Sequence, residues 1–443
     1  MARLRRFRFA PVRRIVRPFQ HFFRRATSGG IVLIIASVFA LVWANSAWGD
    51  QYFSLWQLKF GIGFGRFNIT KDLSHWINDG LMAVFFFVVG LEIKREVLIG
   101  ELSSLNKALL PIAGALGGML MPALIYIYIN YNTDALNGWG IPMATDIAFA
   151  LGVLALLGSR MPLGIKVFLT ALAIVDDLGA VVVIALFYSG DLWWYGILFA
   201  ASFWGCMLVL NLLGARNSLL YLLPGIGLWL SLLSSGVHAT IAGVLAALTI
   251  PARTRINAAE FVENVEGFLQ VFKSSGAQGD NIISSQAQRG AVHAIEQACC
   301  QVESPLVRLE HKLHPWVAFV IIPVFALANA GIALDGIGGT LFSPVATGVM
   351  LGLILGKVIG IFLFSWLAVK FGLAALPAGT SWRQIIGVSA LAGIGFTMSF
   401  FITDLAFDNE EFIRQAKTGI LFASLIAGFL GWALIRSATT TAE

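Results

Sequence analysis

Long blocks of apolar residues dominate this sequence. Of its 443 residues, 58% are apolar and only 12% are charged. A soluble domain carries about 25% charged residues, so this chain has too little polar surface to cover a globule in water. The apolar residues come in blocks and the 46 glycines show no three-residue period, which excludes a disordered or collagen-like chain. The composition therefore predicts a membrane protein.

The apolar blocks have the length of membrane-spanning helices. A hydrocarbon core about 30 Å thick requires roughly 20 residues of helix. Continuous sheet is excluded, because apolar segments that are this long and do not alternate satisfy their backbone groups in lipid only as helix. We expect an all-α polytopic membrane protein with 12 transmembrane helices. They span residues 30–48, 76–91, 108–130, 139–158, 163–188, 193–213, 218–235, 237–250, 315–333, 345–369, 384–404 and 418–436.

The positions of the basic residues predict the orientation. If the N-terminus is cytoplasmic, 24 of the 30 Lys and Arg residues fall on the cytoplasmic side, 5 fall outside and Lys357 lies inside a span. This asymmetry favours an even number of crossings with both termini inside. The net charge of +6 then reflects topology and contact with anionic lipid. No interleaved aromatic and basic pattern indicates binding to nucleic acid.

The chain divides into five segments. Residues 1–29 form a basic cytoplasmic N-terminal segment, 30–252 contain helices 1–8, 253–305 form a polar cytoplasmic insert, 306–437 contain helices 9–12 and 438–443 form a cytoplasmic tail. The first apolar block is too long for a signal peptide and is expected to stay as a helix. Turn signals in the insert predict two short helices. The segment from Trp56 to Asn68 alternates apolar and small residues, which suggests a β-hairpin.

Four ionisable residues stand out deep within the apolar blocks: Asp146, Asp176, Asp177 and Lys357. Each costs about 2.5–3.5 kcal/mol at bilayer depth, so each requires a reason to be there. Lys357 is about 18 Å from either end of its block, too deep for its side chain to reach water easily. It needs an acidic partner, and the three aspartates are the only deep ones. The simplest alternative is a structural ion pair that merely holds helices together.

Asp176 and Asp177 are adjacent in the sequence. Neighbours in a helix point about 100° apart, so the two carboxylates can line one cavity while they face different partners. One can hold Lys357 while the other stays free. Like charges this close in a low dielectric repel, so the pair binds either a proton or a hard cation. An exchanger of protons for cations requires this competition. The alternative is that one aspartate caps a broken helix, which would not explain two.

Two apolar blocks carry residues that interrupt helices. Pro142, Thr145 and Asp146 stand near the start of the fourth block, and Gly393-Ile394-Gly395 lies in the eleventh. Unwound backbone at bilayer depth is tolerated where it lines a wet cavity. Interrupted helices in both halves of a chain are typical of a transporter site.

At these residues the sequence resembles the NhaA-type sodium/proton antiporters. The similarity covers nearly the whole chain from Gly30, and it leaves out the arginine-rich leader and most of the insert from Arg255 to Val302. This family is itself a standard example of a transporter built on interrupted helices. The matching segments are Val89–Glu96, Ala144–Gly152, Ala171–Ala180, Ser235–Thr240, Leu309–Trp316, Phe325–Gly331 and Gly393–Ser399.

The resemblance implies an architecture and a site. The third to fifth and tenth to twelfth helices would form inverted repeats, in which the fourth and eleventh helices are unwound and cross near mid-membrane. Asp176 and Asp177 would bind Na+ and carry protons, with Asp146 and Thr145 at the crossing and Lys357 as the partner of Asp176. A cytoplasmic cluster associated with pH control comprises Glu92, Lys94, Arg95, Glu96, Glu310, His311 and His314. Without the resemblance, that cluster is more simply a solvated face, although histidine does titrate between about pH 5 and 8.

We therefore expect a secondary active antiporter and not an enzyme. It would export cytoplasmic Na+ or Li+ in exchange for external protons across a bacterial inner membrane, electrogenically and under pH control. Hard oxygen ligands suit a small alkali cation. No Gly-x-x-x-x-Gly-Lys motif indicates use of ATP, so the proton gradient would drive transport. No cofactor is expected. The expected partners are these ions, the lipid bilayer and, from the family, a second copy of the chain joined through the Trp56 to Asn68 hairpin.

Two other classes stay open. A sodium-coupled symporter of an organic solute would use similar broken helices. An intramembrane aspartyl protease also needs two membrane aspartates, and such enzymes resemble one another in a Gly-x-Gly-Asp segment. Here Phe396 follows Gly393-Ile394-Gly395. The missing aspartate disfavours the protease.

Overall fold

The structure is built almost entirely of helices. The computed structural model describes residues 27–64, 67–157, 162–275, 285–334, 336–377 and 379–440. The first helices are α2 (Thr27–Ala44), α3 (Gly49–Trp56), α4 (Leu73–His75), α5 (Met82–Ile99), α6 (Leu105–Ile129), α7 (Ile147–Leu156), α8 (Leu163–Phe187), α9 (Trp194–Leu212), α10 (Leu219–Leu233) and α11 (Ile241–Thr249). They are followed by α12 (Ala258–Ser274), α13 (Gln286–Val302), α14 (Pro305–Trp316), α15 (Ile322–Asn329), α16 (Ile337–Leu341), α17 (Pro344–Leu351), α18 (Lys357–Lys370), α19 (Trp382–Leu391), α20 (Phe396–Ala406) and α21 (Glu410–Thr440).

Several of these helices can cross a membrane. In the described part of the chain, 6 helices are long and apolar enough, and two further pairs are bent at a short break, α2 with α3 by 116° and α19 with α20 by 49°. The expected polytopic α-helical membrane protein is confirmed. By length and composition the helices account for up to 8 crossings, so the number twelve stays a prediction. The two counts differ because some predicted spans are divided in the structure. Residues 139–158, for example, are divided between the 3₁₀ segment Leu136–Met143 and α7.

Close contact between α6 and α18 organises the core. A Cβ atom on Gly117 would collide with the backbone oxygen of Gly360, and a Cβ atom on Gly360 would collide with that of Gly117. The two backbones approach this closely because both residues lack a side chain. Lys357 begins α18, and a Cβ atom on Gly118 would lie 3.7 Å from its Cδ atom. The glycine contact therefore fixes the position of Lys357 beside α6.

Gly360→Ala should destabilise the fold by about 1–3 kcal/mol, because the added methyl group overpacks the contact with Gly117. Thermal unfolding of the purified protein in detergent measures the loss. Gly205→Ala on α9 is the matched control, since nothing lies within 4 Å of a Cβ atom there. Alanine is favoured over glycine in a helix by about 1 kcal/mol, so the control should be at least as stable as the parent. Equal melting temperatures for the two variants would contradict this account of the contact.

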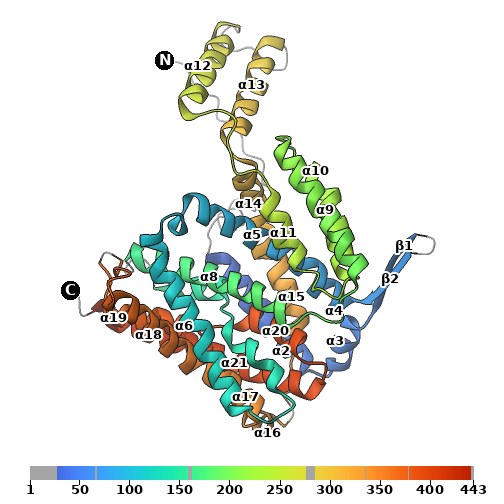
Figure 1. Cartoon of the computed structure of the whole chain (residues 1–443), viewed down its shortest axis with the longest axis vertical. Helices are drawn as coiled ribbons and strands as arrows, with labels where there is room; N and C mark the ends of the chain where they lie inside the picture. The colour runs from blue at the N-terminus through green and yellow to red at the C-terminus, as the bar shows by residue number, and fades with distance from the viewer. Residues whose placement is uncertain are drawn as a thin grey trace.

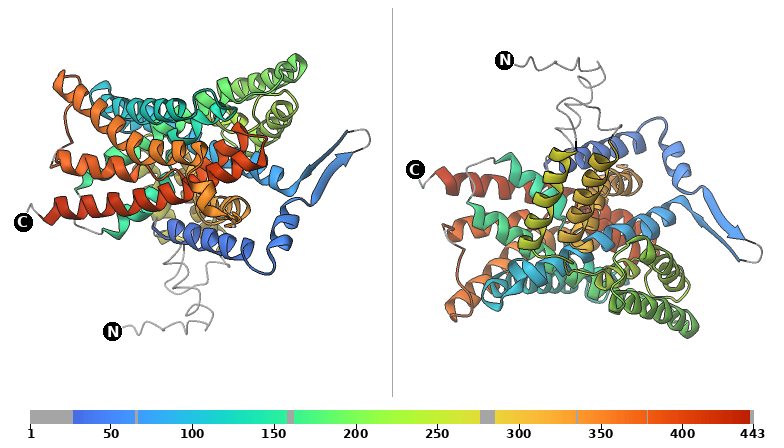
Figure 2. Two further views of the ribbon diagram at one scale, coloured as in Figure 1. Left: turned by 90° about the horizontal axis from the view of Figure 1, so that it is seen from below. Right: turned by 90° about the horizontal axis from the view of Figure 1, so that it is seen from above.

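A β-hairpin projects from the side of the helical body (Figures 1 and 2). Strand β1 (Lys59–Phe64) pairs antiparallel with β2 (Phe67–Asp72), with Lys59 opposite Asp72. Trp76 holds its base, since Trp76 Nε1 donates to the backbone oxygen of Phe60 at 2.8 Å. The expected hairpin is present, but it lies over residues 59–72 and not 56–68, because α3 continues to Trp56.

The polar insert forms a helical hairpin that stands away from the body (Figure 1). Its helices α12 and α13 are the two that the turn signals predict. Each begins with a side-chain cap, in which Asn257 accepts from the backbone N–H of Glu260 and Ser285 accepts from that of Gln288. Gln288 Nε2 also donates across the pair to the backbone oxygen of Phe272 at 3.2 Å.

Candidate functional site

Two interrupted helices touch each other at their breaks. One break separates the 3₁₀ segment from α7, and the other separates α19 from α20. The backbone N–H of Asp146 donates to the oxygen of Ile394 at 2.6 Å, and Thr145 Oγ1 donates to the oxygen of Ala392 at 2.8 Å. Each break thus supplies partners for groups that the other leaves free. Both interruptions expected from the sequence are present.

Asp146 joins the N-terminal ends of two helices. Its carboxylate accepts from the backbone N–H of Phe149 at 3.0 Å, in the first turn of α7, and from that of Thr397 at 3.0 Å, in the first turn of α20. The Thr397 hydroxyl donates to the same carboxylate. Each helix presents the positive end of its dipole here, which favours a negative charge. Asp146 is buried, and both of its oxygens accept hydrogen bonds in this arrangement.

Lys357 pairs with Asp176 in the interior. Lys357 Nζ lies 2.7 Å from Asp176 Oδ2, and the two side chains are 0% and 1% exposed. The ammonium also donates to the backbone oxygen of Met143, the last residue of the 3₁₀ segment. A free carbonyl at the end of a helical segment favours a neighbouring cation. Of the three deep aspartates, Asp176 is therefore the one that contacts Lys357.

Asp177 is buried without a polar partner. It is 2% exposed, and no hydrogen bond or ion pair joins it to the residues that the structure describes. Its Oδ1 atom and the Oδ1 atom of Asp176 are both buried and unpaired. A buried carboxylate oxygen without a partner is costly, and a bound proton or cation removes that cost. The arrangement is suited to reversible binding of a small cation by oxygen ligands.

Part of the predicted pH-response cluster comes together near Arg95. The Arg95 guanidinium donates to Glu96 at 2.8 Å and to Glu310. Glu92 precedes them on α5, just beyond the apolar run at residues 76–91. Burial raises the pKa of Glu92 to about 7, although the positive charge of Arg95 acts in the opposite direction. Glu310 is buried, so its charge depends on Arg95 for compensation.

The other predicted cluster residues have different surroundings. Lys94 donates to two backbone oxygens at the C-terminal end of α11, each at 2.6 Å. A lysine in this position satisfies carbonyl groups that a helix end leaves free. His311 lies 3.7 Å from Glu303, which the sequence did not single out, and His314 follows it on α14. The predicted cluster is thus divided among three sets of contacts.

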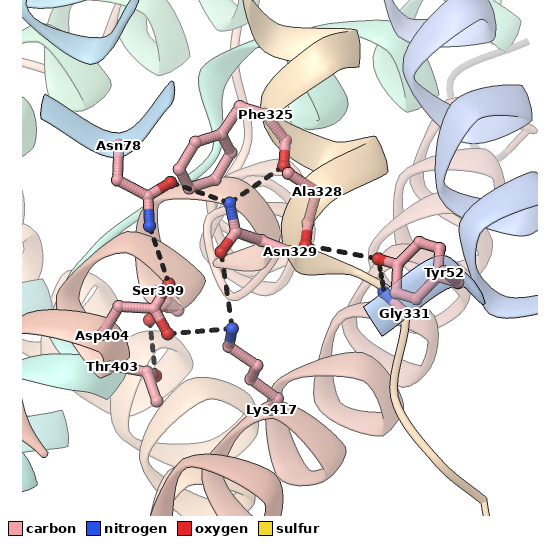
Figure 3. Close-up of polar contacts among 10 residues, drawn as sticks. All are labelled: Tyr52, Asn78, Phe325, Ala328, Asn329, Gly331, Ser399, Thr403, Asp404 and Lys417. Atoms are coloured by element: carbon pink, nitrogen blue, oxygen red, sulfur yellow. Dashed lines mark hydrogen bonds and ion pairs between the residues drawn. The ribbon is translucent and has the colours of Figure 1, made fainter. Parts of the chain in front are cut away.

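Two further polar contacts join residues that no sequence pattern pairs. Asp404 on α20 forms an ion pair with Lys417 on α21 at 2.8 Å (Figure 3). His238, between α10 and α11, lies 3.6 Å from Asp79, and its Nδ1 atom lies 2.7 Å from Thr240 Oγ1. Asp404 ends the eleventh predicted block and Lys417 directly precedes the twelfth. Charged residues are common at the ends of membrane spans, so the sequence by itself does not indicate a function for either residue.

The fold and this geometry define a class of protein. Apolar helices long enough to span a membrane surround two interrupted helices that meet at their breaks, and carboxylates with free oxygens lie close by. Secondary transporters bind their ions where discontinuous helices meet in this way. The protein is a secondary transporter of the interrupted-helix type.

Comparison with known proteins identifies the family. The family model described as Na+/H+ antiporter 1 matches residues 20–435. The Na(+)/H(+) antiporter NhaA of Oleidesulfovibrio alaskensis is 52% identical over 96% of this chain and 95% of that protein. The Na(+)/H(+) antiporter NhaA 2 of Syntrophotalea carbinolica is 52% identical over 95% and 97%, and the NhaA of Koribacter versatilis is 49% identical over 98% and 94%, respectively. The chain belongs to the Na+/H+ antiporter 1 family, as the motifs indicate.

Proposed function

We propose that Asp176 and Asp177 form the site at which this chain exchanges Na+ for protons. The chain belongs to a family of Na+/H+ antiporters and is a transporter, not an enzyme. The observation that carries the proposal is the pair of buried, unpaired Oδ1 atoms on these adjacent residues. A proton or Na+ satisfies them, and the two compete for the same oxygens.

The exchange cycle follows from this competition. Na+ that reaches Asp177 meets carboxylate oxygens with no other partner, and it displaces the proton that neutralised them. After the site opens to the other side of the membrane, a proton displaces Na+ in the same way. Thr145 donates its hydroxyl proton to Ala392, which leaves its lone pairs free to face a cation. Asp146 acts by holding the two breaks together through Phe149 and Thr397.

Lys357 sets the charge balance of the site. Its ammonium compensates Asp176, so Asp177 is the carboxylate whose charge a bound cation balances. If this ion pair opens during the cycle, Asp176 or Lys357 carries a second proton. Exchange of two protons for one Na+ moves net charge, and we propose electrogenic transport on this ground. Li+ is a second substrate in this proposal, because it is also a hard monovalent cation.

The proposed orientation places both termini on the cytoplasmic side of a bacterial inner membrane. Its support is the excess of basic residues on that side. In this orientation the α12–α13 hairpin is cytoplasmic, β1 and β2 are external, and sodium leaves the cell as protons enter. We also propose a homodimer joined through the β-hairpin, because its two-stranded sheet leaves both edges open for pairing.

Proton release on addition of Na+ tests the proposed site. The purified protein should release protons in the absence of any organic solute, and its apparent affinity for Na+ should fall as the pH is lowered, because protons then occupy more of the sites. A Na+ affinity that does not change with pH would rule out a shared site. Proton release that requires an organic solute would favour the symporter instead.

Glu92→Gln should flatten the pH dependence of exchange around neutrality. The pKa of Glu92 is about 7, so this group loses its proton as the pH rises through the neutral range. Glutamine resembles the protonated form of Glu92 at every pH. Above pH 7, we therefore expect the variant to exchange at the rate that the parent shows below pH 7. Initial rates in proteoliposomes at pH 6, 7 and 8 measure this. The control is Glu101→Gln, which removes a half-exposed carboxylate 3.8 Å from Lys107. Parallel profiles for both variants would remove Glu92 from the proposed pH response.

A further inference from the structure

Four polar side chains form a closed ring outside the site described above (Figure 3). Lys417 Nζ lies 2.8 Å from Asp404 Oδ1 and donates to Asn329 Oδ1 at 3.4 Å. Asn329 Nδ2 donates to Asn78 Oδ1 at 3.0 Å, and Asn78 Nδ2 donates to Asp404 Oδ2 at 3.3 Å. The four residues come from α21, α20, α15 and the π-helical segment Trp76–Leu81. We call these four residues the polar ring.

The polar ring lies further along α20, the helix that begins where the two breaks meet. We call this meeting point the crossing. Thr397, in the first turn of α20, is bonded to Asp146, and Asp404 follows seven residues later on the same helix. Seven residues make two turns to within about 20° and rise about 10.5 Å, so Asp404 projects from the same face of α20 as Thr397. The polar ring is thus two turns from the crossing, towards the C-terminal end of α20.

An aromatic layer separates the crossing from the polar ring. Phe400 and Phe401 lie between Thr397 and Asp404 on α20 and are 0% and 1% exposed. The ring of Phe401 packs against those of Phe86, His238 and Phe325 from three other segments, at centroid distances of 5.6, 5.4 and 6.3 Å. Lys417 Nζ lies 5.9 Å from the centroid of Phe400, so the aromatic layer and the polar ring are in contact.

The polar ring joins two groups of helices. On one side, α21 packs along α17, α19 and α20. On the other side, α15 packs against α2, and the segment Trp76–Leu81 leads into α5. Tyr52 fixes the end of α15, because its hydroxyl donates to the backbone oxygen of Leu327 at 2.8 Å. The same hydroxyl lies 3.2 Å from the oxygen of Ala328 and accepts from the N–H of Gly331 at 3.1 Å (Figure 3). The ion pair lies within the first group, and the asparagine contacts cross to the second.

We propose that Asp404 and Lys417 are gating residues for the exchange. Their ion pair, with Asn78 and Asn329, closes the end of the ion path on the side from which β1 and β2 project. Carboxylate and amide oxygens that hold an ammonium suit Na+ as well, so a passing ion must replace the Lys417 ammonium on Asp404. The proposal rests on the proposed ion site at Asp176 and Asp177, because the path is the route from that site to the surface.

Side-specific thiol labelling tests the gate. The parent has Cys206, Cys299 and Cys300 replaced by serine, and Thr403→Cys places a reporter thiol beside Asp404. Thr403 is 0% exposed, so labelling of this thiol reports opening of the structure. A membrane-impermeant thiol reagent is added to vesicles on the side of the β-hairpin. We expect Lys417→Gln and Asp404→Asn each to raise the labelling rate by about 10-fold, because each removes one partner of the ion pair and shifts the population towards the open form. Na+ at saturating concentration should slow the labelling of Lys417→Gln, whereas the bulky cation N-methylglucamine should not.

Two variants separate gating from a loss of structure. Lys417→Arg keeps the positive charge, and the exchanged pair Asp404→Lys with Lys417→Asp restores opposite charges, so both should label at close to the parent rate. Arg414→Gln is the matched control, because it breaks an exposed ion pair of 2.8 Å with Glu411 on the same helix. The proposal is overturned if Lys417→Gln labels at the parent rate or if the exchanged pair labels as fast as the single variants. Labelling does not require Asp177, so it can fail or succeed independently of the exchange assay on the proposed ion site.

Discussion

Asp177→Asn should reduce sodium-dependent proton flux in proteoliposomes by at least about 100-fold, equivalent to about 2.7 kcal/mol in the barrier. Asparagine has nearly the same shape as aspartate, but it neither takes up a proton in this pH range nor supplies the negative charge that a bound Na+ needs. The buried position of Asp177 and its unpaired Oδ1 atom make it the carboxylate for which no other described residue substitutes. A pH-sensitive dye trapped in the vesicles measures the flux.

The control for this experiment is Asp134→Asn, which changes an exposed aspartate in the loop after α6. It should exchange at the parent rate. Circular dichroism of both purified variants establishes that the helices are intact. Flux through Asp177→Asn within a factor of two of the parent would remove Asp177 from the exchange site, and the proposed competition between proton and Na+ would then have to lie elsewhere.

Lys357→Met should destabilise the protein by about 3–5 kcal/mol, because it leaves the Asp176 carboxylate buried without its compensating charge. Methionine keeps most of the length of the lysine side chain, so the loss reports on charge and not on volume. Thermal or denaturant unfolding in detergent micelles measures the difference. The expected loss exceeds that of Gly360→Ala, which affects packing alone.

The double variant Asp176→Asn with Lys357→Met distinguishes the two explanations. If the ion pair is the cause, removing both charges should recover most of the stability, since no uncompensated charge stays in the interior. The double variant should still lose exchange activity if Asp176 takes part in transport. A double variant no more stable than Lys357→Met would show that the uncompensated carboxylate is not the cause, and the loss would then come from the missing hydrogen bond to Met143.

The sequence predicts the main features of this fold because the membrane imposes them. Blocks of about 20 apolar residues with few charges have one structural solution in lipid, and the polytopic helical fold follows. Pro142 and the Gly393–Gly395 segment mark both interruptions, since neither continues a helix easily. The need of Lys357 for an acidic partner also follows from its depth. The residues alone leave open which of the three aspartates pairs with it, and only the resemblance implies Asp176. The choice is a tertiary contact that depends on the close packing of α18 on α6 through Gly117 and Gly360.

Contacts at the ends of spans could not be predicted in this way. Asp404 and Lys417 stand where charged residues commonly leave the bilayer, and only the packing of α20 along α21 brings them within 2.8 Å. The same holds for Asp79 and His238, which are separated by more than four predicted spans and yet lie 3.6 Å apart. The bounds of the β-hairpin shifted for a local reason, because the helical run of α3 extends to Trp56.

Asp146 bonds to both α7 and α20, and this has a mechanical consequence. Its one carboxylate accepts hydrogen bonds from the first turns of both α7 and α20, and Asp176 is fastened to the same region through Lys357 and Met143. Pulling the two half-helices apart would leave these donors buried without partners, which costs several kcal/mol. They therefore behave as a stiff joint. Alternate access to the two sides of the membrane would then come from sliding of the whole joint past the helices around it, and not from bending within it.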